Sequence, residues 1–234
     1  MSTAAAILIP PGVTVFCDPT LRPAMRSLDK ISRAQAGAPV SVLSAPAMSM
    51  LAQIQRHTRN DVLITLSVAM DQAVQLQLVR PETRVDGFSN PLVLARLSAR
   101  GTMKVAPAGL PAMLAGSKLA VTDGTVASGL DGRAVLNANG LGLSGQVMGA
   151  ATTADVAFLI TTGAADIGLV YLTDVKADPR LTVLATLNAD PSLTLYSGAV
   201  NAQAVSPNAQ AVLNVMRGTA GSAALRTAGL EMAS

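Results

Sequence analysis

The sequence is poor in aromatic side chains: Phe, Tyr and Trp make up 2% of its 234 residues, and Trp is absent. Proteins that stack bases or sugar rings depend on such side chains, so we expect neither a base-stacking surface nor a carbohydrate cleft. Charged residues are also few, at 13%, and the net charge is only +3, without a cluster of Lys or Arg. A nucleic-acid partner is therefore not expected, and a small molecule is favoured instead.

Cysteine and histidine are equally scarce, with one of each, Cys17 and His57. A single cysteine excludes an intramolecular disulfide and a cage of several cysteine ligands, and a lone histidine argues against a zinc site. We therefore expect no metal and no cofactor. Cys17 is interpreted as a small buried residue and His57 as a surface residue.

Long apolar runs are missing as well. No segment approaches the ~18 residues of a membrane-spanning helix, so direct membrane insertion is not expected. Residues 4–9 are apolar, but they lack a basic leader and are short for the core of a signal peptide. Two locations stay open, which are the periplasm, if an export signal has been cleaved, and the cytoplasm otherwise.

The chain does contain a regular alternation of apolar runs and helical patterns, and half of it is hydrophobic. Strands are predicted at residues 13–16, 40–43, 61–65, 88–96, 119–121, 167–171, 181–187 and 193–200. Helices are predicted at residues 20–31, 48–57, 70–78, 110–116, 130–137, 152–161, 208–217 and 220–228. This order predicts an α/β fold in which two mostly parallel sheets are flanked by helices.

The turn after the first predicted strand reads Cys-Asp-Pro-Thr at residues 17–20. Thr20 suits the N-cap of the next helix, and the backbone N–H groups of such a turn can bind an oxyanion. Ordinary strand-to-helix turns have the same pattern, so the turn alone does not establish a site. Asp18 fits an Asx-type turn before Pro19, or, if it faces a cleft, a general base.

Several segments, taken in order, resemble those of one protein family. They are Val-Thr-Val-Phe at residues 13–16, Leu-Ala-Gln-Ile at 51–54, Asn-Asp-Val-Leu-Ile at 60–64, and residues 83–94, 118–123, 166–174, 206–213 and 228–230. The family is that of the periplasmic molybdate-binding proteins, the solute receptors of ABC importers, which has aconitate-isomerase-like relatives. The resemblance implies a two-lobed periplasmic-binding fold with two crossing hinge strands. Lobe one would hold residues 1–88 and 199–234, and lobe two residues 89–198.

In that family an oxyanion lies between the lobes, bound by hydroxyls, by N–H groups at helix N-termini and by one Tyr hydroxyl. Carried over by position, the ligand-binding residues would be Thr20, Ala47, Ser128, Thr153 and Tyr171. Ala47 stands where the family has a hydroxyl ligand. Asp174 and Lys176, which follow Tyr171, are expected in a solvated turn.

Asp18 is a departure from the family, which has small residues at this point. The carboxylate changes which ligand is expected. A carboxylate ~4 Å from an oxyanion costs on the order of 1 to 4 kcal/mol of binding free energy. This repulsion would be avoided if Asp18 pointed away or paired with Arg22 or Arg33. An organic acid with a hydroxyl or a proton to donate is therefore favoured over molybdate.

Two principal functions stay open. The first is a solute-binding protein that closes on a small anion, an oxyanion or an organic carboxylate, and has the membrane subunits of an ABC importer as partners. The second is a cofactor-free isomerase on the same fold, which would move an allylic proton in an unsaturated di- or tricarboxylate with Asp18 as the base. A cytoplasmic ligand sensor without chemistry would share the same cleft.

Overall fold

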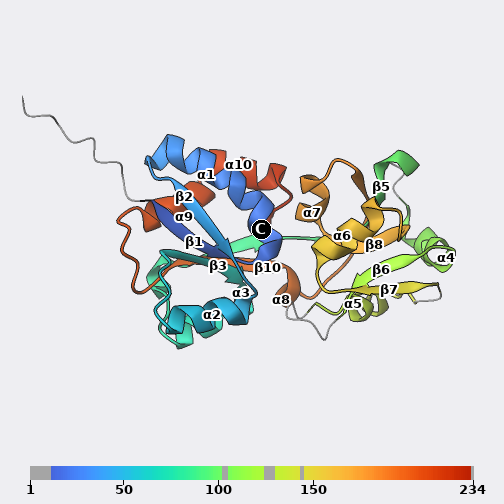
Figure 1. Cartoon of the computed structure of the whole chain (residues 1–234), viewed down its shortest axis with the longest axis horizontal. Coiled ribbons are helices and arrows are strands. Elements are labelled where there is room, and N and C mark those ends of the chain that lie inside the picture. The colour runs from blue at the N-terminus through green and yellow to red at the C-terminus, as the bar shows by residue number, and fades with distance from the viewer. Residues whose placement is uncertain (1–11, 102–104, 124–129, 143–144, 233–234) are drawn as a thin grey trace, which may run out of the picture.

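The structure is a computed structural model that describes residues 12–101, 105–123, 130–142 and 145–232. In these ranges the chain forms a six-stranded and a five-stranded sheet, each with helices on both faces. The two units lie side by side along the longest axis of the molecule (Figure 1). This arrangement confirms the two-lobed α/β fold. We call the unit around the six-stranded sheet lobe one and the other lobe two.

The sheet of lobe one contains strands from both ends of the chain. Its spatial order is β11 (Glu231–Met232), β4 (Val85–Ser89), β10 (Leu195–Val200), β3 (Val62–Leu66), β1 (Val13–Cys17) and β2 (Val40–Ser44). Strand β1 pairs in parallel with β2 and β3, whereas β10 is antiparallel to both β3 and β4. Four of the five β1 residues are buried, as expected for a central strand covered on both faces.

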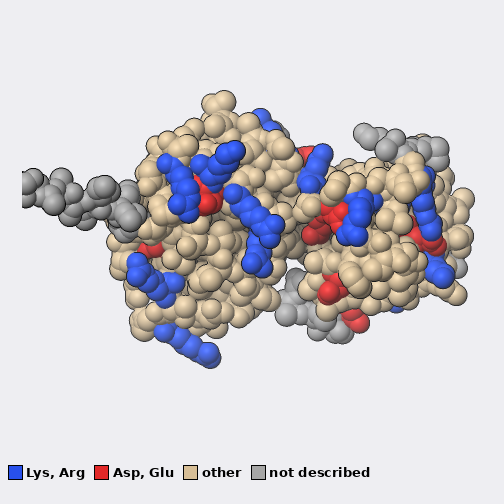
Figure 2. Space-filling view, turned by 45° about the horizontal axis from the view of Figure 1, so that its top comes forward, with Lys and Arg blue, Asp and Glu red and all other residues tan. Residues whose placement is uncertain are grey.

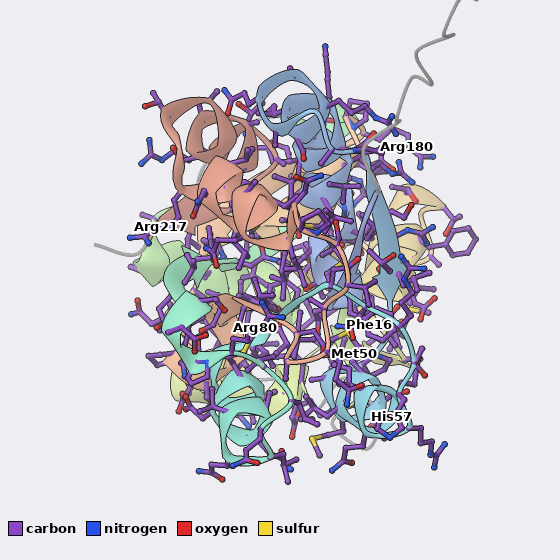
Figure 3. The ribbon with its side chains drawn as sticks, turned by 90° about the vertical axis from the view of Figure 1, so that its left-hand side faces the viewer. Phe16, Met50, His57, Arg80, Arg180 and Arg217 are labelled. Atoms are coloured by element: carbon purple, nitrogen blue, oxygen red, sulfur yellow. The ribbon has the colours of Figure 1, made fainter. Side chains whose placement is uncertain are left out.

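Helices from distant parts of the sequence cover the two faces of this sheet. The first face packs against α1 (Arg22–Ala36), α9 (Ala209–Arg217) and α10 (Thr219–Thr227), and the other against α2 (Ala47–Gln55) and α3 (Ser67–Gln75). Phe16 and Met50 belong to the core under α2, whereas His57 lies at the outer edge of the lobe (Figure 3). Cys17 is buried, as predicted, and its burial raises the pKa of the thiol to about 11.

The sheet of lobe two has the order β7 (Val147–Ala150), β6 (Leu119–Thr122), β8 (Ile167–Tyr171), β5 (Leu92–Leu97) and β9 (Leu181–Thr186). Strand β6 is parallel to β7 and β8, and β5 is antiparallel to β8 and β9. One face packs against α4 (Leu110–Ala115) and α5 (Gly132–Ala138), the other against α6 (Thr153–Thr161) and α7 (Leu172–Ala177).

Helix α6 approaches β8 closely because β8 contains a glycine at the point of contact. A Cβ atom on Gly168 would lie 2.4 Å from Cγ1 of Val156 and 2.9 Å from Cδ1 of Ile160. Any side chain at this position would push α6 away from the sheet. Gly168 therefore fixes the distance between β8 and α6, and with it the position of the N-terminus of α6.

Two segments connect the lobes. One passes through Asn90 and Pro91 between β4 and β5, and the other contains the short helix α8 (Pro191–Thr194) between β9 and β10. The prediction of one strand over residues 88–96 is wrong, because β4 ends in the first sheet and β5 begins in the second. Pro91 has no N–H group for a strand ladder, which explains why the break falls here. Strand β7 and helix α7 are also absent from the sequence-based prediction.

Charged side chains lie in separate groups on both lobes, and several Lys and Arg residues are beside Asp or Glu on the face shown in Figure 2. Among the described residues, none of the helices combines the length and apolar character needed to cross a bilayer. The same part of the chain has no group of three or more His, Cys, Asp or Glu side chains placed to hold a metal ion.

Candidate ligand-binding cleft

A cavity of about 320 Å³ lies between the two lobes. Lobe one contributes Asp18, Pro19, Thr20, Pro46, Leu66 and Tyr196, and lobe two contributes Leu130, Ala151, Thr152, Thr153, Ala154, Tyr171 and Asp174. Residues that are far apart in the sequence therefore share one space at the carboxyl ends of β1, β3, β7 and β8. This edge of a parallel sheet is where α/β proteins generally bind ligands.

The lobe-one wall is built from the turn that leads into the 3-10 helix η1 (Pro19–Leu21). Oδ1 of Asp18 accepts hydrogen bonds from the backbone N–H of Thr20 at 3.0 Å and from Oγ1 of Thr20 at 2.8 Å. The N–H of Asp18 donates to Ile64 and that of Leu21 to the Asp18 carbonyl. The N–H groups of this turn, where an external anion could have bound, are thus occupied: that of Thr20 by the Asp18 carboxylate and those of Asp18 and Leu21 by backbone carbonyls.

Burial raises the pKa of the Asp18 carboxyl, and the two hydrogen bonds from Thr20 only partly oppose this effect. Asp190 makes the same Asp-Pro turn, with Oδ1 accepting from the N–H of Ser192 at 2.8 Å, but it is exposed. Hydrogen bonds from the side chain and the N–H of Ser192 lower the pKa of Asp190. The opposite direction at Asp18 therefore comes from its place in the cavity and not from the local turn.

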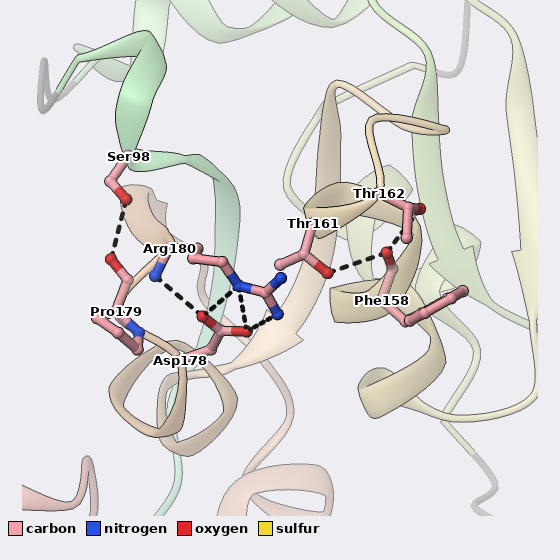
Figure 4. A network of polar contacts seen from close by, with 7 residues as sticks. All are labelled: Ser98, Phe158, Thr161, Thr162, Asp178, Pro179 and Arg180. Carbon is pink, nitrogen blue, oxygen red and sulfur yellow. Dashed lines mark hydrogen bonds and ion pairs between the residues drawn. The ribbon is translucent and has the colours of Figure 1, made fainter.

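Neither arginine that could have neutralised Asp18 forms an ion pair with it among the described residues. Arg33 pairs with Asp29 at 3.0 Å on the surface of α1. The side chains that line the cavity include Asp18 and Asp174 but, in the described part of the chain, no Lys, Arg or His. Arg180, for example, binds Asp178 at 2.6 Å in a separate network of lobe two (Figure 4).

The lobe-two wall contains the N-terminus of α6. Thr152 and Asp155 form a capping box, in which Oγ1 of Thr152 accepts the N–H of Asp155 at 3.1 Å and Oδ2 of Asp155 accepts the N–H of Thr152 at 3.0 Å. The intervening N–H groups of Thr153 and Ala154 have no partner among the hydrogen bonds of the described residues. Since both residues line the cavity, these two N–H groups form its free donor site.

Two tyrosines line the cavity, one from each sheet. The hydroxyl of Tyr171, at the end of β8, donates to the carbonyl of Leu193 at 2.9 Å. The hydroxyl of Tyr196, in β10, lies 3.0 Å from Oγ1 of Thr20. Because Thr20 gives its single hydroxyl hydrogen to Asp18, Tyr196 is the donor in this pair. Burial raises the pKa of both phenols, so both remain protonated.

Asp174 lies in the first turn of α7 and faces the same cavity. Its Oδ2 accepts the N–H of Tyr171 at 3.1 Å, and its carboxylate is hydrogen-bonded to the side chain of Thr153. Burial, with a smaller contribution from the charge of Asp18, raises the pKa of Asp174 to about 6. The expectation of a solvated turn at Asp174 is therefore wrong, because α7 directs this residue toward the space between the lobes.

Of the predicted site residues, Asp18, Thr20, Thr153 and Tyr171 come together around the cavity. Ala47 begins α2 beside the lining residue Pro46 and is not itself among the lining residues. Ser128 lies outside the described residues.

Sequence reasoning missed Tyr196 as well as Asp174. A usable signal was present, since Tyr196 is one of only two tyrosines, and a buried phenol needs a hydrogen-bond partner.

Two lobes, two connecting segments and a cavity between them define the two-lobed periplasmic-binding fold. The chain belongs to the bacterial extracellular solute-binding protein family, whose model matches residues 13–231. A search among curated proteins finds no match.

Solved structures with the same fold include a substrate-binding domain assigned to a molybdenum ABC transporter of Clostridium difficile. It has 19% identity and a TM-score of 0.76 over 96% of this chain and 100% of that one. The periplasmic molybdate-binding protein of Azotobacter vinelandii has 18% identity and a TM-score of 0.73, over 95% and 100% of the two chains. Iron-bound HitA from Pseudomonas aeruginosa has 16% identity and a TM-score of 0.60, over 92% and 84%. At these identities the likeness establishes the fold, and the names show that this fold accepts chemically different ligands.

Proposed function

We propose that this protein binds a small anion between its lobes and serves as the solute receptor of an ABC importer. The observation that carries the proposal is the pair of N–H groups of Thr153 and Ala154, two residues that line the inter-lobe cavity and whose N–H groups have no partner among the described residues. A helix N-terminus attracts negative charge through its unpaired N–H groups and its dipole. Membership of an extracellular solute-binding family and the molybdate receptors among the structural neighbours support the same assignment.

Capture of the anion would bring the two lobes together. Only two segments connect the lobes, so a hinge motion changes few backbone angles. The partners would be the membrane subunits of the importer, and the protein would act outside the cytoplasmic membrane, in the periplasm of a cell with two membranes. No cofactor takes part in this function.

The test is a comparison of two variants at the N-terminus of α6. The anions used as probes are lactate, malate, succinate, hydrogen phosphate and molybdate, and at least one should raise the melting temperature of the native protein. For that anion, Ala154→Asp should weaken binding by about tenfold or more, because a carboxylate then sits on the free N–H groups. Ala154→Asn has the same size without the charge and should bind within about threefold of the native protein.

Ala154 is exposed and lies in the first helical turn, where an aspartate stabilises a helix. Loss of binding in Ala154→Asp cannot then be ascribed to unfolding. If none of the probes stabilises the native protein, or if Ala154→Asp binds as tightly as Ala154→Asn, the anion receptor is the wrong function.

A second candidate is the isomerase that moves an allylic proton in an unsaturated di- or tricarboxylate. The observation in its favour is Asp18, a cavity-lining carboxylate whose pKa is raised by burial, as is common for a general base. Incubation with cis-aconitate followed by NMR tests it. Formation of trans-aconitate that Asp18→Asn abolishes would establish the enzyme, and unchanged cis-aconitate would leave a receptor.

A further inference from the structure

Among the described residues, the hydroxyl groups that line the cavity already give their hydrogens to protein acceptors. The pairs are Thr20 to Asp18 at 2.8 Å, Thr152 to Asp155 at 2.8 Å, Tyr171 to the Leu193 carbonyl at 2.9 Å, Tyr196 to Thr20 at 3.0 Å, and Thr153 to Asp174. A hydroxyl has one hydrogen to donate and two lone pairs that accept. These groups therefore offer lone pairs to a ligand, and an anion would find few hydroxyl donors among the described lining residues.

The two carboxylates of the cavity come from opposite lobes, Asp18 from η1 and Asp174 from α7. Each accepts hydrogen bonds from its own lobe: Oδ1 of Asp18 accepts from the N–H and the hydroxyl of Thr20, and Oδ2 of Asp174 accepts from the N–H of Tyr171. An anion without hydrogens would meet these carboxylates with no basic side chain among the described lining residues to offset them. Such an arrangement rejects a ligand that brings only acceptors.

Among the described residues, the backbone donors without a partner lie on one wall only, whereas each wall has a carboxylate. The free N–H groups of Thr153 and Ala154 belong to lobe two, whereas the turn of Asp18 in lobe one has its N–H groups occupied. We infer that the ligand is a small anion that also carries a hydroxyl hydrogen, with its negative group at the N-terminus of α6 and its O–H directed to the carboxylate of Asp18. The inference rests on the proposed function and adds the chemical class of the ligand.

The dimensions of the cavity agree with an organic acid of this class. Its volume of about 320 Å³ is at the lower end of the ~300–1,000 Å³ typical of pockets for organic ligands. A hydroxycarboxylic acid supplies a carboxylate and an O–H group from one small molecule. Hydrogen phosphate supplies the same two features from an inorganic source, so the experiment must distinguish the two.

The experiment is calorimetric titration of the full chain at pH 7 with matched pairs of acids that differ in one hydroxyl. The pairs are lactate and propionate, malate and succinate, and citrate and tricarballylate; sulfate, molybdate and hydrogen phosphate complete the set. In at least one pair the hydroxy acid should bind about tenfold or more tightly than the acid without the hydroxyl. Without the O–H group, the ligand has no hydrogen to donate to the carboxylate of Asp18. Hydrogen phosphate should bind more tightly than sulfate by a similar factor. If hydrogen phosphate binds more tightly than all the hydroxy acids, the ligand is the inorganic anion and not a hydroxycarboxylic acid.

Two variants test whether the preference for a hydroxy acid comes from Asp18. Asp18→Asn keeps Oδ1 as the acceptor for the N–H of Thr20 but removes the charge, so the preference for the hydroxy acid should fall to within about threefold and sulfate should gain affinity. Asp190→Asn is the matched control, because it changes the same Asp-Pro turn outside the cavity lining. It should keep the discrimination of the native protein.

The outcomes distinguish failure of the inferred ligand class from failure of the proposed receptor function. If succinate, propionate, sulfate or molybdate bind as tightly as the hydroxy acids and hydrogen phosphate, the inference about ligand class is overturned while the anion receptor stands. The inference is overturned equally if Asp18→Asn keeps the full discrimination. If none of these anions binds, the proposed function fails, and the inference fails with it.

Discussion

The hydroxyl of Thr173 donates a hydrogen bond to the backbone carbonyl of Thr20 at 2.8 Å, across the boundary between the lobes. Thr173 belongs to α7 and precedes the cavity residue Asp174, and Thr20 belongs to η1 and itself lines the cavity. The same hydroxyl accepts a hydrogen bond from Nδ2 of Asn90, in the first connecting segment, at 3.0 Å. The hinge and both acidic walls of the cavity are thereby connected through one buried network.

Thr173→Val should destabilise the protein, because valine keeps the shape of threonine but cannot hydrogen-bond. The Thr20 carbonyl and the Asn90 amide would lose their partner in a region where Thr173 and Asn90 are fully buried. The expected loss in the free energy of unfolding is ~1–3 kcal/mol. Urea denaturation measures this loss.

Thr162→Val is the control for this prediction. Thr162 is exposed and donates to carbonyls of its own helix, at 2.9 Å to Phe158 (Figure 4). This change should cost less than about 0.5 kcal/mol. Equal stability losses in the two variants would mean that the contact between Thr173 and Thr20 has no special importance.

Tyr171→Phe should weaken ligand binding and also loosen the second connecting segment. The hydroxyl of Tyr171 holds the carbonyl of Leu193, which lies in α8 next to β10. Removing it should lower the free energy of unfolding by about 1 kcal/mol and should change the geometry of the cavity wall. The dissociation constant for the tightest anion of the set, measured by calorimetry, should rise about threefold or more. An unchanged constant would remove this hydroxyl from the binding site.

The fold could be predicted from the sequence because it depends on local patterns that recur along the chain. The apolar run of β1 and the helical spacing of α1 and α2 contain their own signal. The lobe boundary was expected at residues 88/89, but the break of the strand at Pro91 was missed because residues 88–96 are β-favouring on both sides of it. A pattern within one segment does not reveal that its two halves belong to different sheets.

The site was less predictable, because its chemistry depends on which groups become buried together. Asp18 and Asp190 both precede proline, and nothing in these turns tells that one is half-buried in a cavity and the other exposed. The opposite directions of their pKa shifts arise only from the fold. The resemblance to a known family supplied Thr20, Thr153 and Tyr171, but the place of Asp174 in the cavity required the three-dimensional structure.

Gly168→Ala should destabilise lobe two and weaken anion binding together. The new methyl group would lie 2.4 Å from Cγ1 of Val156, so α6 must move away from β8. Overpacking of this kind costs ~1–3 kcal/mol. The shift also moves the N–H groups of Thr153 and Ala154, so the dissociation constant should rise even at temperatures where the variant is folded.

Gly149→Ala, in β7, is the matched control, since a Cβ atom there would meet Cβ of Asp123 at an ordinary 4.0 Å. Its stability should change by less than about 0.5 kcal/mol. If Gly168→Ala proves as stable as this control, the close packing of α6 on β8 does not determine the position of the anion site.

Asp174 should make the stability of the protein fall as the pH rises. Its pKa is raised from 3.8 to about 6, so the folded state favours the protonated carboxyl. This contribution is fully present below pH ~4, is lost between pH ~4 and ~6, and stays lost above that. Asp174→Asn keeps an oxygen for the N–H of Tyr171 and removes the titration. The free energy of unfolding of this variant, relative to that of the native protein, should therefore increase from pH 4 to pH 6. The increase should reach at most about 3 kcal/mol at neutral pH. Urea denaturation at pH 4, 5, 6 and 7 measures it.

The affinity for the anion should also depend on the protonation of Asp174. Deprotonation of Asp174 places a second negative charge in the cavity beside Asp18, so the affinity for an anion should decrease as the pH rises through about 6. For one linked proton the decrease is at most about tenfold per pH unit. Lactate is a suitable probe because its single carboxyl stays ionised between pH 5 and pH 8, and calorimetry at both values gives the slope. Asp174→Asn should bind lactate with nearly the same affinity at both pH values. A native protein whose affinity is constant, or rises with pH, would show that Asp174 does not face the bound anion.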